Sequence, residues 1–349
     1  MKTRLAWTIA LWLASGSIVH TAFALGDGTL QLHFMDVGQG DGAILISPHG
    51  ETVLFDEGPR ENCDHLLAYL RELGIDRIDY HVASHYHADH IGCAAEVLHE
   101  FPLTGRALDR GGSYDSKTYG EYVAVVGSHR ETATAHTVIV LDSTTASPVE
   151  IDVVALNGDT VATTNENDLS LVAVVHFAHF SAELGGDLSG VKTGNYEDIE
   201  SGVAPRVGPL DVYKVHHHGS RYSSNEAWLR VTHPQVAVLS EGSDNRYGHP
   251  TAECLNRLHQ SIHRVYWTEA GAGAAPDPAF DVVGGNIAVH VMGDRQIFTV
   301  TCSAAADTFS IGGGPFHFGL ATRTSDVASP FALPAGAGSP ADSGNGSKR

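Results

Sequence analysis

The sequence has few basic side chains for its length. It carries 21 Lys and Arg against 41 Asp and Glu among 349 residues, which gives a formal net charge of −20. A field of this sign repels polyanions at long range and argues against a protein that binds nucleic acid broadly and without specificity. It does not exclude catalysis on phosphodiesters, because bound divalent cations can reverse the local sign of the potential.

Long apolar runs are lacking beyond the N-terminus. Residues 1–24 have the pattern of a secretory signal: Lys2 and Arg4, then the apolar run "LAWTIALWLASGSIV", then small residues ending at Ala24. An uncleaved membrane anchor is the alternative, and the Ser and Gly residues in this short run disfavour it. We therefore expect a secreted or periplasmic protein with no membrane span in the mature chain. Without Lys2 and Arg4 it has 19 basic against 41 acidic side chains, a net charge of −22.

Cysteine is scarce. The four cysteines, Cys63, Cys93, Cys254 and Cys302, show no C-x-x-C spacing, so nothing indicates a sulfur-ligated metal. Disulfides can form in an exported chain, and four cysteines allow three pairings. We favour Cys63 with Cys93 and Cys254 with Cys302, because each pair lies within one half of the chain. Four buried thiols are the alternative.

The first third of the chain alternates strand and helix signals. Residues 29–58 contain apolar runs of strand length broken by Gly-rich turns, which predicts consecutive antiparallel strands. Residues 62–74 have helical spacing, with Asn62 as a cap and Gly74 as the stop. A short strand over 78–84 then leads into a polar loop and a second helical stretch. Open α/β sheets usually hold their chemistry where a strand meets such a loop.

The second half repeats this arrangement. Strands are predicted at 148–156, 169–178, 180–187, 211–215, 235–240, 265–271, 285–292 and 295–302, and helices at 225–231 and 251–260. Two mixed sheets flanked by helices imply an α/β protein with a four-layer αββα sandwich over residues 25–321. Residues 322–349 are rich in Ser, Ala, Gly and Pro, which predicts a disordered tail.

The stretch "SHYHADHIG", residues 84–92, gathers three histidines and an aspartate. His85 and His87 are two positions apart, so in an extended segment they point the same way and can bind one ion. Asp89 and His90 come where the chain turns into a helix and can face a second ion. A chance cluster on a solvated loop is the alternative, and the ligand-like residues after later strands disfavour it.

Seven segments then occur in the order found in one protein family: "FMDVGQGDGAILI", "LFDEG", "SHYHADHIG", "NENDLSLVAVV", "GGDLSG", "DVYKVHHHGS" and "NRYGHP". The H-x-H-x-D-H pattern is the signature of the metallo-β-lactamase fold. From about Thr29 to Cys302 the sequence resembles the metallo-β-lactamase domain of ComEC-type competence proteins. "HHGS" followed by N-x-Y-G-H-P is the more discriminating pair, since lactamases and lactonases do not typically show it. The family carries this domain at the end of a membrane channel, which we do not expect here.

The resemblance implies a set of metal ligands. Its members are His85, His87, Asp89, His90, Asp187, His217 and His249. Asp187 would bridge two ions, and Asp89 and Asp187 would be the catalytic carboxylates. The run "HHHGS" leaves open whether His217 or His218 points inward. Imidazole and carboxylate ligands suit zinc, with manganese or iron as alternatives.

Other residues are implied around the metals. Asp56 would orient a histidine or the loop backbone, or else cap a tight glycine turn, and Asp36 and Asp41 would line the rim of the site. The segment "TTNENDLS" offers residues such as Asn167 where most hydrolases of the fold have a histidine. The candidate contacts with an anionic substrate are Lys214, Ser220 and Asn245, each with a plain surface role as the alternative.

The leading functional hypothesis is a secreted metal-dependent hydrolase, specifically a phosphodiesterase or nuclease that uses a hydroxide held between two divalent ions. Nucleic acid enters only as a substrate, and small phosphodiesters or short oligonucleotides agree best with the acidic composition. The alternative is a lactam, lactone or thioester hydrolase of the same fold. A metal-binding module without turnover is disfavoured, because the ligand set is nearly complete.

Overall fold

The computed structural model describes residues 25–312. The predicted signal segment (1–24) and the predicted tail (322–349) lie outside the described residues. Within 25–312, no helix has the length and hydrophobicity needed to cross a membrane.

The first sheet has nine strands in the order β19-β18-β17-β1-β2-β3-β4-β5-β6. The predicted antiparallel run forms its centre, and from β3 to β6 neighbouring strands are parallel. The bounds are β1 (Leu30–Phe34), β2 (Gly42–Ile46), β3 (Thr52–Glu57), β4 (Tyr80–Val82), β5 (Ala107–Asp109), β6 (Arg130–Thr132), β17 (Ile287–Met292), β18 (Ile297–Thr301) and β19 (Ala306–Ser310).

The second sheet has eight strands in the order β16-β15-β14-β13-β10-β9-β8-β7. Strands β7 to β10 are antiparallel, and β10 with β13 to β16 are parallel. The bounds are β7 (Val138–Leu141), β8 (Val149–Ala155), β9 (Val172–Phe177), β10 (Phe180–Leu184), β13 (Val212–Lys214), β14 (Val236–Leu239), β15 (Arg264–Trp267) and β16 (Asp281–Val283). A separate hairpin joins β11 (Gly190–Thr193) to β12 (Tyr196–Asp198).

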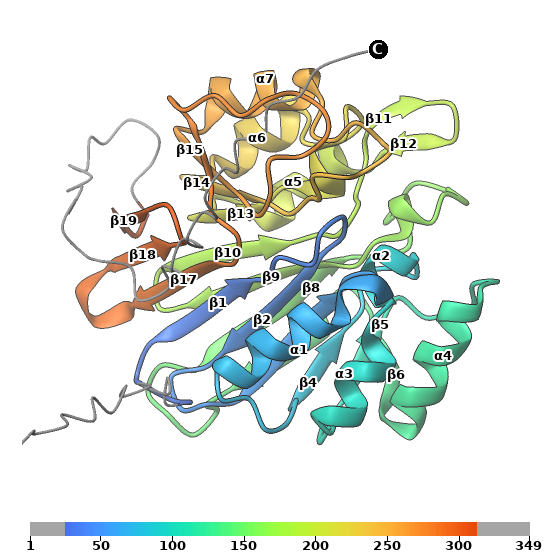
Figure 1. Ribbon diagram of the computed structural model, residues 1–349, viewed down its shortest axis with the longest axis vertical. Helices are drawn as coiled ribbons and strands as arrows, with labels where there is room; N and C mark the ends of the chain where they lie inside the picture. The colour runs from blue at the N-terminus through green and yellow to red at the C-terminus, as the bar shows by residue number, and fades with distance from the viewer. Residues whose placement is uncertain (1–24, 313–349) are drawn as a thin grey trace, which may run out of the picture.

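Helices cover the outer face of each sheet, so the predicted αββα sandwich is confirmed (Figure 1). One layer consists of α1 (Cys63–Glu72), α3 (Ala94–Glu100) and α4 (Lys117–Val126), and the other of α5 (Glu200–Val207), α6 (Glu226–Thr232) and α7 (Ala252–Ser261). The short α2 (Ala88–Ile91) lies in the polar loop that follows β4.

The two sheets pack face to face on an apolar core. Alternate residues of β1, such as Leu30 and Leu32, point into it, as do Val149 and Ile151 of β8. Period-two alternation of this kind is what a strand with one face toward a core requires. The parallel strand β14, with the sequence VAVL, is apolar throughout because the helices bury its second face as well. The polar ends of the strands are thereby left at one edge of the sandwich.

One of the two predicted disulfides is present. Cys63 and Cys93 form a disulfide, which ties the start of α1 to the residue before α3. Cys254 and Cys302 are free thiols, so the second predicted pair is wrong. Cys254 is a buried residue of α7 and packs against the outer face of the second sheet, whereas Cys302 follows β18 of the first sheet. Membership of the same half of the sequence did not bring them together.

We expect alkylation of unreduced, denatured protein to label Cys254 and Cys302 and leave Cys63 and Cys93 linked. Cross-linking residues 30 positions apart removes loop-closure entropy from the unfolded chain. Cys93→Ala should therefore lower the free energy of unfolding by about 3 to 4 kcal/mol, measured in denaturant. Cys302→Ala is the matched control and should change it little. Four labelled thiols in wild-type protein would contradict the pairing.

Candidate metal centre

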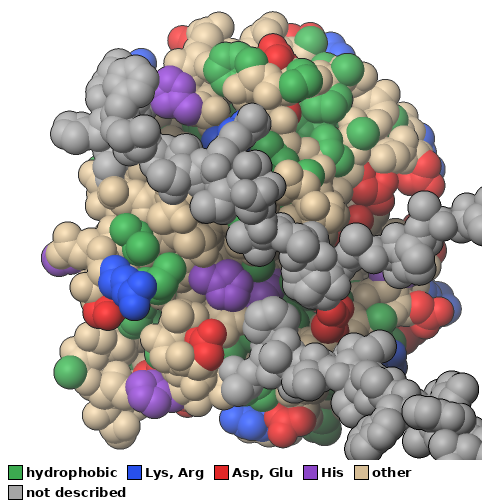
Figure 2. Space-filling view, turned by 60° about the vertical axis from the view of Figure 1, so that its left-hand side comes forward, with side chains coloured by type: hydrophobic (Ala, Val, Ile, Leu, Met, Phe, Trp, Pro, Cys, Tyr) green, Lys and Arg blue, Asp and Glu red, His purple; other side chains and the backbone are tan. Residues whose placement is uncertain are grey.

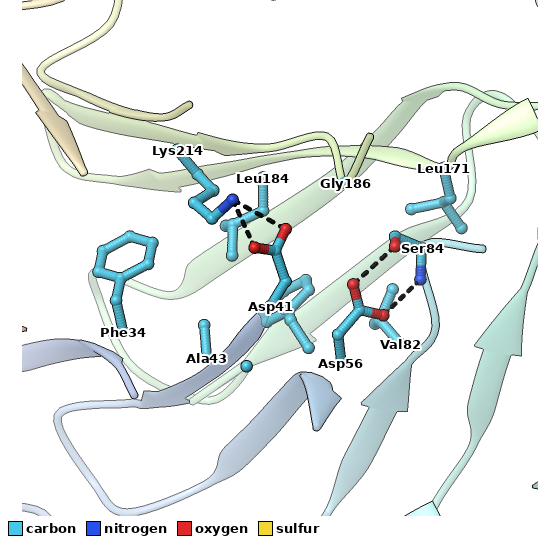
Figure 3. Close-up of a pocket in the computed structure, with 12 residues that line it drawn as sticks. Phe34, Asp41, Ala43, Asp56, Val82, Ser84, Leu171, Leu184, Gly186 and Lys214 are labelled. Atoms are coloured by element: carbon cyan, nitrogen blue, oxygen red, sulfur yellow. Dashed lines mark hydrogen bonds and ion pairs between the residues drawn. The ribbon is translucent and has the colours of Figure 1, made fainter. Parts of the chain in front are cut away.

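Asp56, the next-to-last residue of β3, holds both ends of the histidine loop. Its carboxylate accepts hydrogen bonds from Ser84 N (2.8 Å) and Ser84 Oγ (2.6 Å), which Figure 3 shows. His90 Nδ1 lies 2.8 Å from Asp56 Oδ2 and must donate, because a carboxylate only accepts. In the neutral ring that a metal would bind, this leaves Nε2 of His90 as the nitrogen with a free lone pair.

Glu166 holds the middle of the same loop. Its Oε1 accepts the backbone N–H of Tyr86 (2.9 Å), and its Oε2 lies 2.6 Å from Arg110 Nη2. The Arg110 guanidinium in turn stacks over the Tyr86 ring at 4.3 Å. Glu166 and Arg110 were not expected from the sequence, although Glu166 lies within the segment "TTNENDLS".

Asp187 follows β10 after a glycine turn that brings the backbone close to the histidine loop. Gly186 has φ +55°, and a Cβ atom there would lie only 2.6 Å from Ser84 Oγ. The backbone N–H of Asp187 donates to Ser170 Oγ at 3.2 Å. The Asp187 carboxylate is thereby placed, buried, opposite the loop after β4.

His217 and His218 follow β13 in a left-handed turn, with φ of 50° and 51°. Each non-glycine residue in this conformation costs about 1 to 2 kcal/mol, and such strain tends to occur at functional sites. The turn is held where His217 N donates to Gly186 O (3.1 Å) and Ser220 N donates to His217 O (2.8 Å).

The two oxygens of Asp187 face two groups of imidazoles. Asp187 Oδ1 lies 3.2 Å from His90 Nε2 and 3.3 Å from His218 Nε2. Asp187 Oδ2 lies 3.6 Å from His217 Nε2 and 3.8 Å from His85 Nε2. Both of the consecutive histidines therefore point at Asp187, one toward each oxygen.

Two further predicted ligands adjoin these groups. Asp89 Oδ2 lies 3.7 Å from His218 Nε2, and His87 Nδ1 lies 3.0 Å from His85 Nε2. Within residues 25–312, four triplets of ligand atoms lie within 4.8 Å of one another: His85, His90 and Asp187; Asp89, His90 and His218; Asp41, Asp187 and His218; and Asp41, Asp56 and His90.

The donor set fits a divalent metal ion. The atoms His90 Nε2, Asp187 Oδ1 and His218 Nε2 are buried and lack any hydrogen-bond partner among the described residues. Leaving buried polar atoms unsatisfied costs about 1 to 3 kcal/mol each. Converging imidazole nitrogens and a carboxylate oxygen are what zinc and related cations bind.

Burial and mutual charges set the protonation states here. Burial alone would raise the pKa of Asp187, but the imidazoles of His217 and His218 hold it well below its usual range. Burial, with the neighbouring His90, lowers the pKa of His85 well below its ordinary value. A neutral His85 beside an ionised Asp187 is the state in which both can donate electron pairs to a cation.

Asp41 and Lys214 lie beneath the cluster rather than at its rim. Lys214 Nζ is 2.7 Å and 2.8 Å from the two oxygens of Asp41 and donates to Val215 O (Figure 3). Asp41 Oδ1 is also 3.3 Å from His218 Nδ1, which donates to Ser240 O. The predicted substrate contact by Lys214 is therefore corrected, because its side chain is 4% exposed and its charge is already paired.

Asn245 and Ser220 also have structural partners. Asn245 Nδ2 donates to Gly242 O and His249 O, while its Oδ1 accepts the backbone N–H groups of Tyr247 and His249. All its polar atoms are thus used in shaping the loop that carries His249, which leaves none for a substrate. Ser220 is buried at the edge of the site, where its Oγ accepts a weak hydrogen bond from the backbone N–H of Tyr222 at 3.3 Å.

The remaining predicted residues divide between the site and its surroundings. Asn167 Nδ2 lies 3.2 Å from His217 Nε2, and the His249 ring is 5.5 Å from that of His217. Burial and its histidine neighbours lower the pKa of His249 to about 3. Asp36 accepts the N–H of Gly38 and is absent from the metal-ligand triplets; burial and Glu269 raise its pKa to about 6.

The cluster opens into a wide cleft of about 1100 Å³. The metal-ligand candidates that line it are His87, Asp89, Asp187, His217, His218 and His249. Its walls carry tyrosines and basic side chains, namely Arg60, Lys117, Tyr196, Arg221, Tyr222, Arg246 and Tyr247. One side of the cluster is therefore accessible to a ligand, while Asp41, Asp56 and Lys214 close the other.

This chain belongs to the metallo-β-lactamase superfamily, whose family model matches residues 43–240. Within it the chain is similar to competence proteins, as its motifs predict. It is 27% identical over 256 residues to ComE operon protein 3 of Bacillus subtilis, covering 68% of this chain and 32% of that protein. It is 28% identical over 246 residues to Recombination protein 2 of Haemophilus influenzae, covering 68% and 27%. The match thus spans less than a third of each relative's length.

Solved structures of the same fold are also similar. A metallo hydrolase from Ignicoccus hospitalis aligns with a TM-score of 0.38 and 17% identity, covering 60% of this chain and 81% of that one. The metallo-β-lactamase SMB-1 aligns with a TM-score of 0.37 and 13% identity, covering 55% and 77%. The family and the ligand cluster together support a metal-dependent hydrolase.

We expect Lys214→Met to lower the free energy of unfolding by about 3 to 5 kcal/mol, because it leaves the Asp41 carboxylate buried without a counter-charge. The double variant Asp41→Asn with Lys214→Met removes both charges and should recover much of that loss. Urea unfolding of the three proteins measures this. A Lys214→Met protein of wild-type stability that only binds substrate more weakly would restore the substrate role for Lys214.

Glu241 is a second buried carboxyl near the site, two residues beyond β14. Both of its carboxyl oxygens lack hydrogen-bond partners among the described residues. They lie against Gly271, where a Cβ atom would be 2.6 Å from Glu241 Oε2 and from Pro250 Cδ. Burial, with the charges of Glu269 and Asp281, raises the pKa of Glu241 to about 9.

This pKa makes stability fall as the pH rises. Between the unfolded value of 4.5 and the folded value of about 9, the folded state retains a proton that the unfolded state has lost. The free energy of unfolding therefore decreases by up to ~1.4 kcal/mol per pH unit in that window. Glu241→Gln should remove this slope, and so stabilise the protein more at pH 8 than at pH 5 in urea unfolding. An equal effect at both pH values would contradict the shifted pKa.

Proposed function

We propose that this protein is a dinuclear metal-dependent phosphodiesterase. The observation that carries the proposal is the position of Asp187, whose two oxygens face separate groups of imidazoles. The first metal would be held by His85, His87, His217 and Asp187 Oδ2, and the second by Asp89, His90, His218 and Asp187 Oδ1. His249 lies in neither group, and we assign it to the substrate side of the cleft.

Two bound divalent cations, zinc or else manganese or iron, would polarise a phosphoryl oxygen and lower the pKa of a water toward neutrality. The chain itself orients the ligands for this task. Asp56 accepts a hydrogen bond from the Nδ1–H of His90, and Ser240 O accepts one from the Nδ1–H of His218, so each ring presents Nε2 to the cluster. Asp41 and Lys214 fill the space behind the rings with a paired charge, which keeps the buried side closed.

A phosphodiester substrate agrees with the relatives and with the cleft. One relative is named as a recombination protein, and recombination acts on nucleic acid. Arg60, Lys117, Arg221 and Arg246 line the cleft of an otherwise acidic protein. On the face drawn in Figure 2, the described acidic and basic side chains are scattered and form no continuous basic surface. Small phosphodiesters or short oligonucleotides therefore fit better than long duplexes.

We also propose that the protein works outside the cytosol, in the periplasm or secreted. The Cys63–Cys93 disulfide supports this, because disulfides persist in oxidising compartments and are rare where thiols are kept reduced. The pattern of residues 1–24 points the same way.

The test is turnover and metal content on one metal-loaded preparation. We expect wild-type protein to hold two divalent ions per chain and to hydrolyse bis-p-nitrophenyl phosphate or a single-stranded oligonucleotide. Asp187→Ala removes the ligand shared by both groups, so it should reduce the bound metal and lower turnover by about 1000-fold or more. Residues that only hydrogen-bond to metal ligands already cost about 10- to 100-fold when they are mutated.

Asp36→Asn is the matched control, because Asp36 lies outside the metal-ligand triplets. It should retain both ions and most of the turnover. Nitrocefin and an acyl-homoserine lactone serve as competing substrates. If wild-type protein opens either of these and leaves phosphodiesters and oligonucleotides intact, the phosphodiesterase proposal is wrong and the lactam or lactone hydrolase replaces it.

A further inference from the structure

Five rings that line the cleft form a continuous series of ring contacts, called the arc below. The Tyr222 and Tyr196 rings stack at 4.6 Å and 23°, and Tyr196 is 6.0 Å from His217. The His217 ring is then 5.5 Å from His249, which stacks with Tyr247 at 5.7 Å and 27°. All five residues line the cleft and come from three separate segments of the chain. The tyrosines thus stand on either side of the two histidines that adjoin the metal cluster.

Tyr247 is held open to solvent at the lip of the cleft. Its side chain is 55% exposed, the highest value for a large hydrophobic residue among those described; the others, Val138 and Val140, lie on the edge strand β7. The loop that carries it is fixed, because Asn245 Oδ1 accepts the Tyr247 N–H at 3.2 Å. The exposed Arg246 lies 5.2 Å over the Tyr247 ring. An aromatic ring fixed at a site but left unburied is suited to contact a ligand rather than a core.

Three of the four lysine and arginine side chains that line this cleft are already paired with acids, and Arg246 is the exception. Arg60 and Lys117 both pair with Glu121, each at 3.1 Å, and Arg221 lies 3.8 Å from Glu253. The chain as a whole has a net charge of −20. Beyond the charge of bound metal ions and Arg246, an anionic diester would gain affinity through its uncharged parts, and stacking on aromatic rings supplies this for any planar group.

We propose that Tyr247 at one end of the arc and the Tyr196–Tyr222 pair at the other are two stacking subsites for planar groups on either side of the cleaved phosphate. The inference rests on the proposed phosphodiesterase function and assigns its specificity. Nucleoside or aryl groups on both sides of the phosphorus are favoured over alkyl groups. Stacking is indifferent to which base is bound, so the site selects planar groups and not a sequence.

Two diesters that release the same chromophore test this: thymidine 5′-(p-nitrophenyl phosphate) and methyl p-nitrophenyl phosphate. The same bond breaks in both, and only the second substituent changes. We expect kcat/KM of the metal-loaded wild-type protein to favour the thymidine ester by about 5- to 150-fold, the range of stacking on one ring. One of the two variants Tyr247→Ala and Tyr222→Ala, the one at the subsite that holds thymine, should abolish this preference by raising KM for the thymidine ester. The other, at the subsite that holds the nitrophenyl group, should raise KM for both esters alike, and the corresponding Phe variants should behave as wild type.

Val140→Ala is the matched control, since it trims an exposed apolar side chain on the edge strand β7 and should preserve the preference. Equal kcat/KM values for the two esters in wild-type protein overturn the inference. So does a preference that survives both alanine variants.

A binding measurement separates this inference from the proposed function. Thymidine 5′-monophosphate and methyl phosphate contain no diester, so their dissociation constants from the metal-loaded protein can be measured by calorimetry without turnover. Tighter binding of the thymidine compound by about 5-fold or more, lost in Tyr247→Ala or Tyr222→Ala, supports the stacking subsites even if no diester is cleaved. Cleavage of diesters with equal binding of both monophosphates upholds the function and overturns the subsites.

Discussion

The buried carboxylate of Asp187 is the constraint on which the rest of the site depends. A charge taken out of water needs partners, and Asp187 has imidazoles within 4 Å on both of its oxygens. These partners come from the loop after β4 of the first sheet and the turn after β13 of the second. The site therefore exists only where the edges of the two sheets meet, and the left-handed backbone at Gly186 permits that approach.

Buried carboxylates and a backbone carbonyl fix the orientation of the histidine rings through hydrogen bonds. The Nδ1–H of His90 donates a hydrogen bond to Asp56. The Nδ1–H of His218 donates to the backbone carbonyl of Ser240 and lies close to Asp41. His216, the first residue of the "HHH" run, lies between Glu183 (3.1 Å) and Glu200 (2.8 Å), and these carboxylates raise its pKa to about 9 against the effect of burial. It points away from the cleft, so three consecutive histidines have three different environments.

Features that depend on residues close together in the sequence could be predicted from it. The αββα architecture and the Asp187 position followed from strand periodicity and the family motifs. Contacts between residues far apart were missed: Lys214 meets Asp41 across 173 positions, and Arg110 meets Glu166 across 56. Strand β6 was also missed, because its three residues "RET" are largely exposed and show no apolar alternation. Pairing by distance along the chain failed for Cys254 and Cys302 for the same reason, since folding placed them in different layers.

An acidic protein can still bind the proposed phosphodiester substrate if its attraction for the substrate is confined to the cleft. A basic surface would hold a polyanion along its whole length, and its strength would fall steeply with salt. Here the cleft's Arg60 and Lys117 already share Glu121, so little basic charge is left to follow a phosphate backbone. Metal ions would supply positive charge at one point, and aromatic rings would supply contact area beside it. Under the proposed function, such a site would act on a short, flexible segment whose bases can turn outward, because stacking needs the flat faces that a duplex keeps covered.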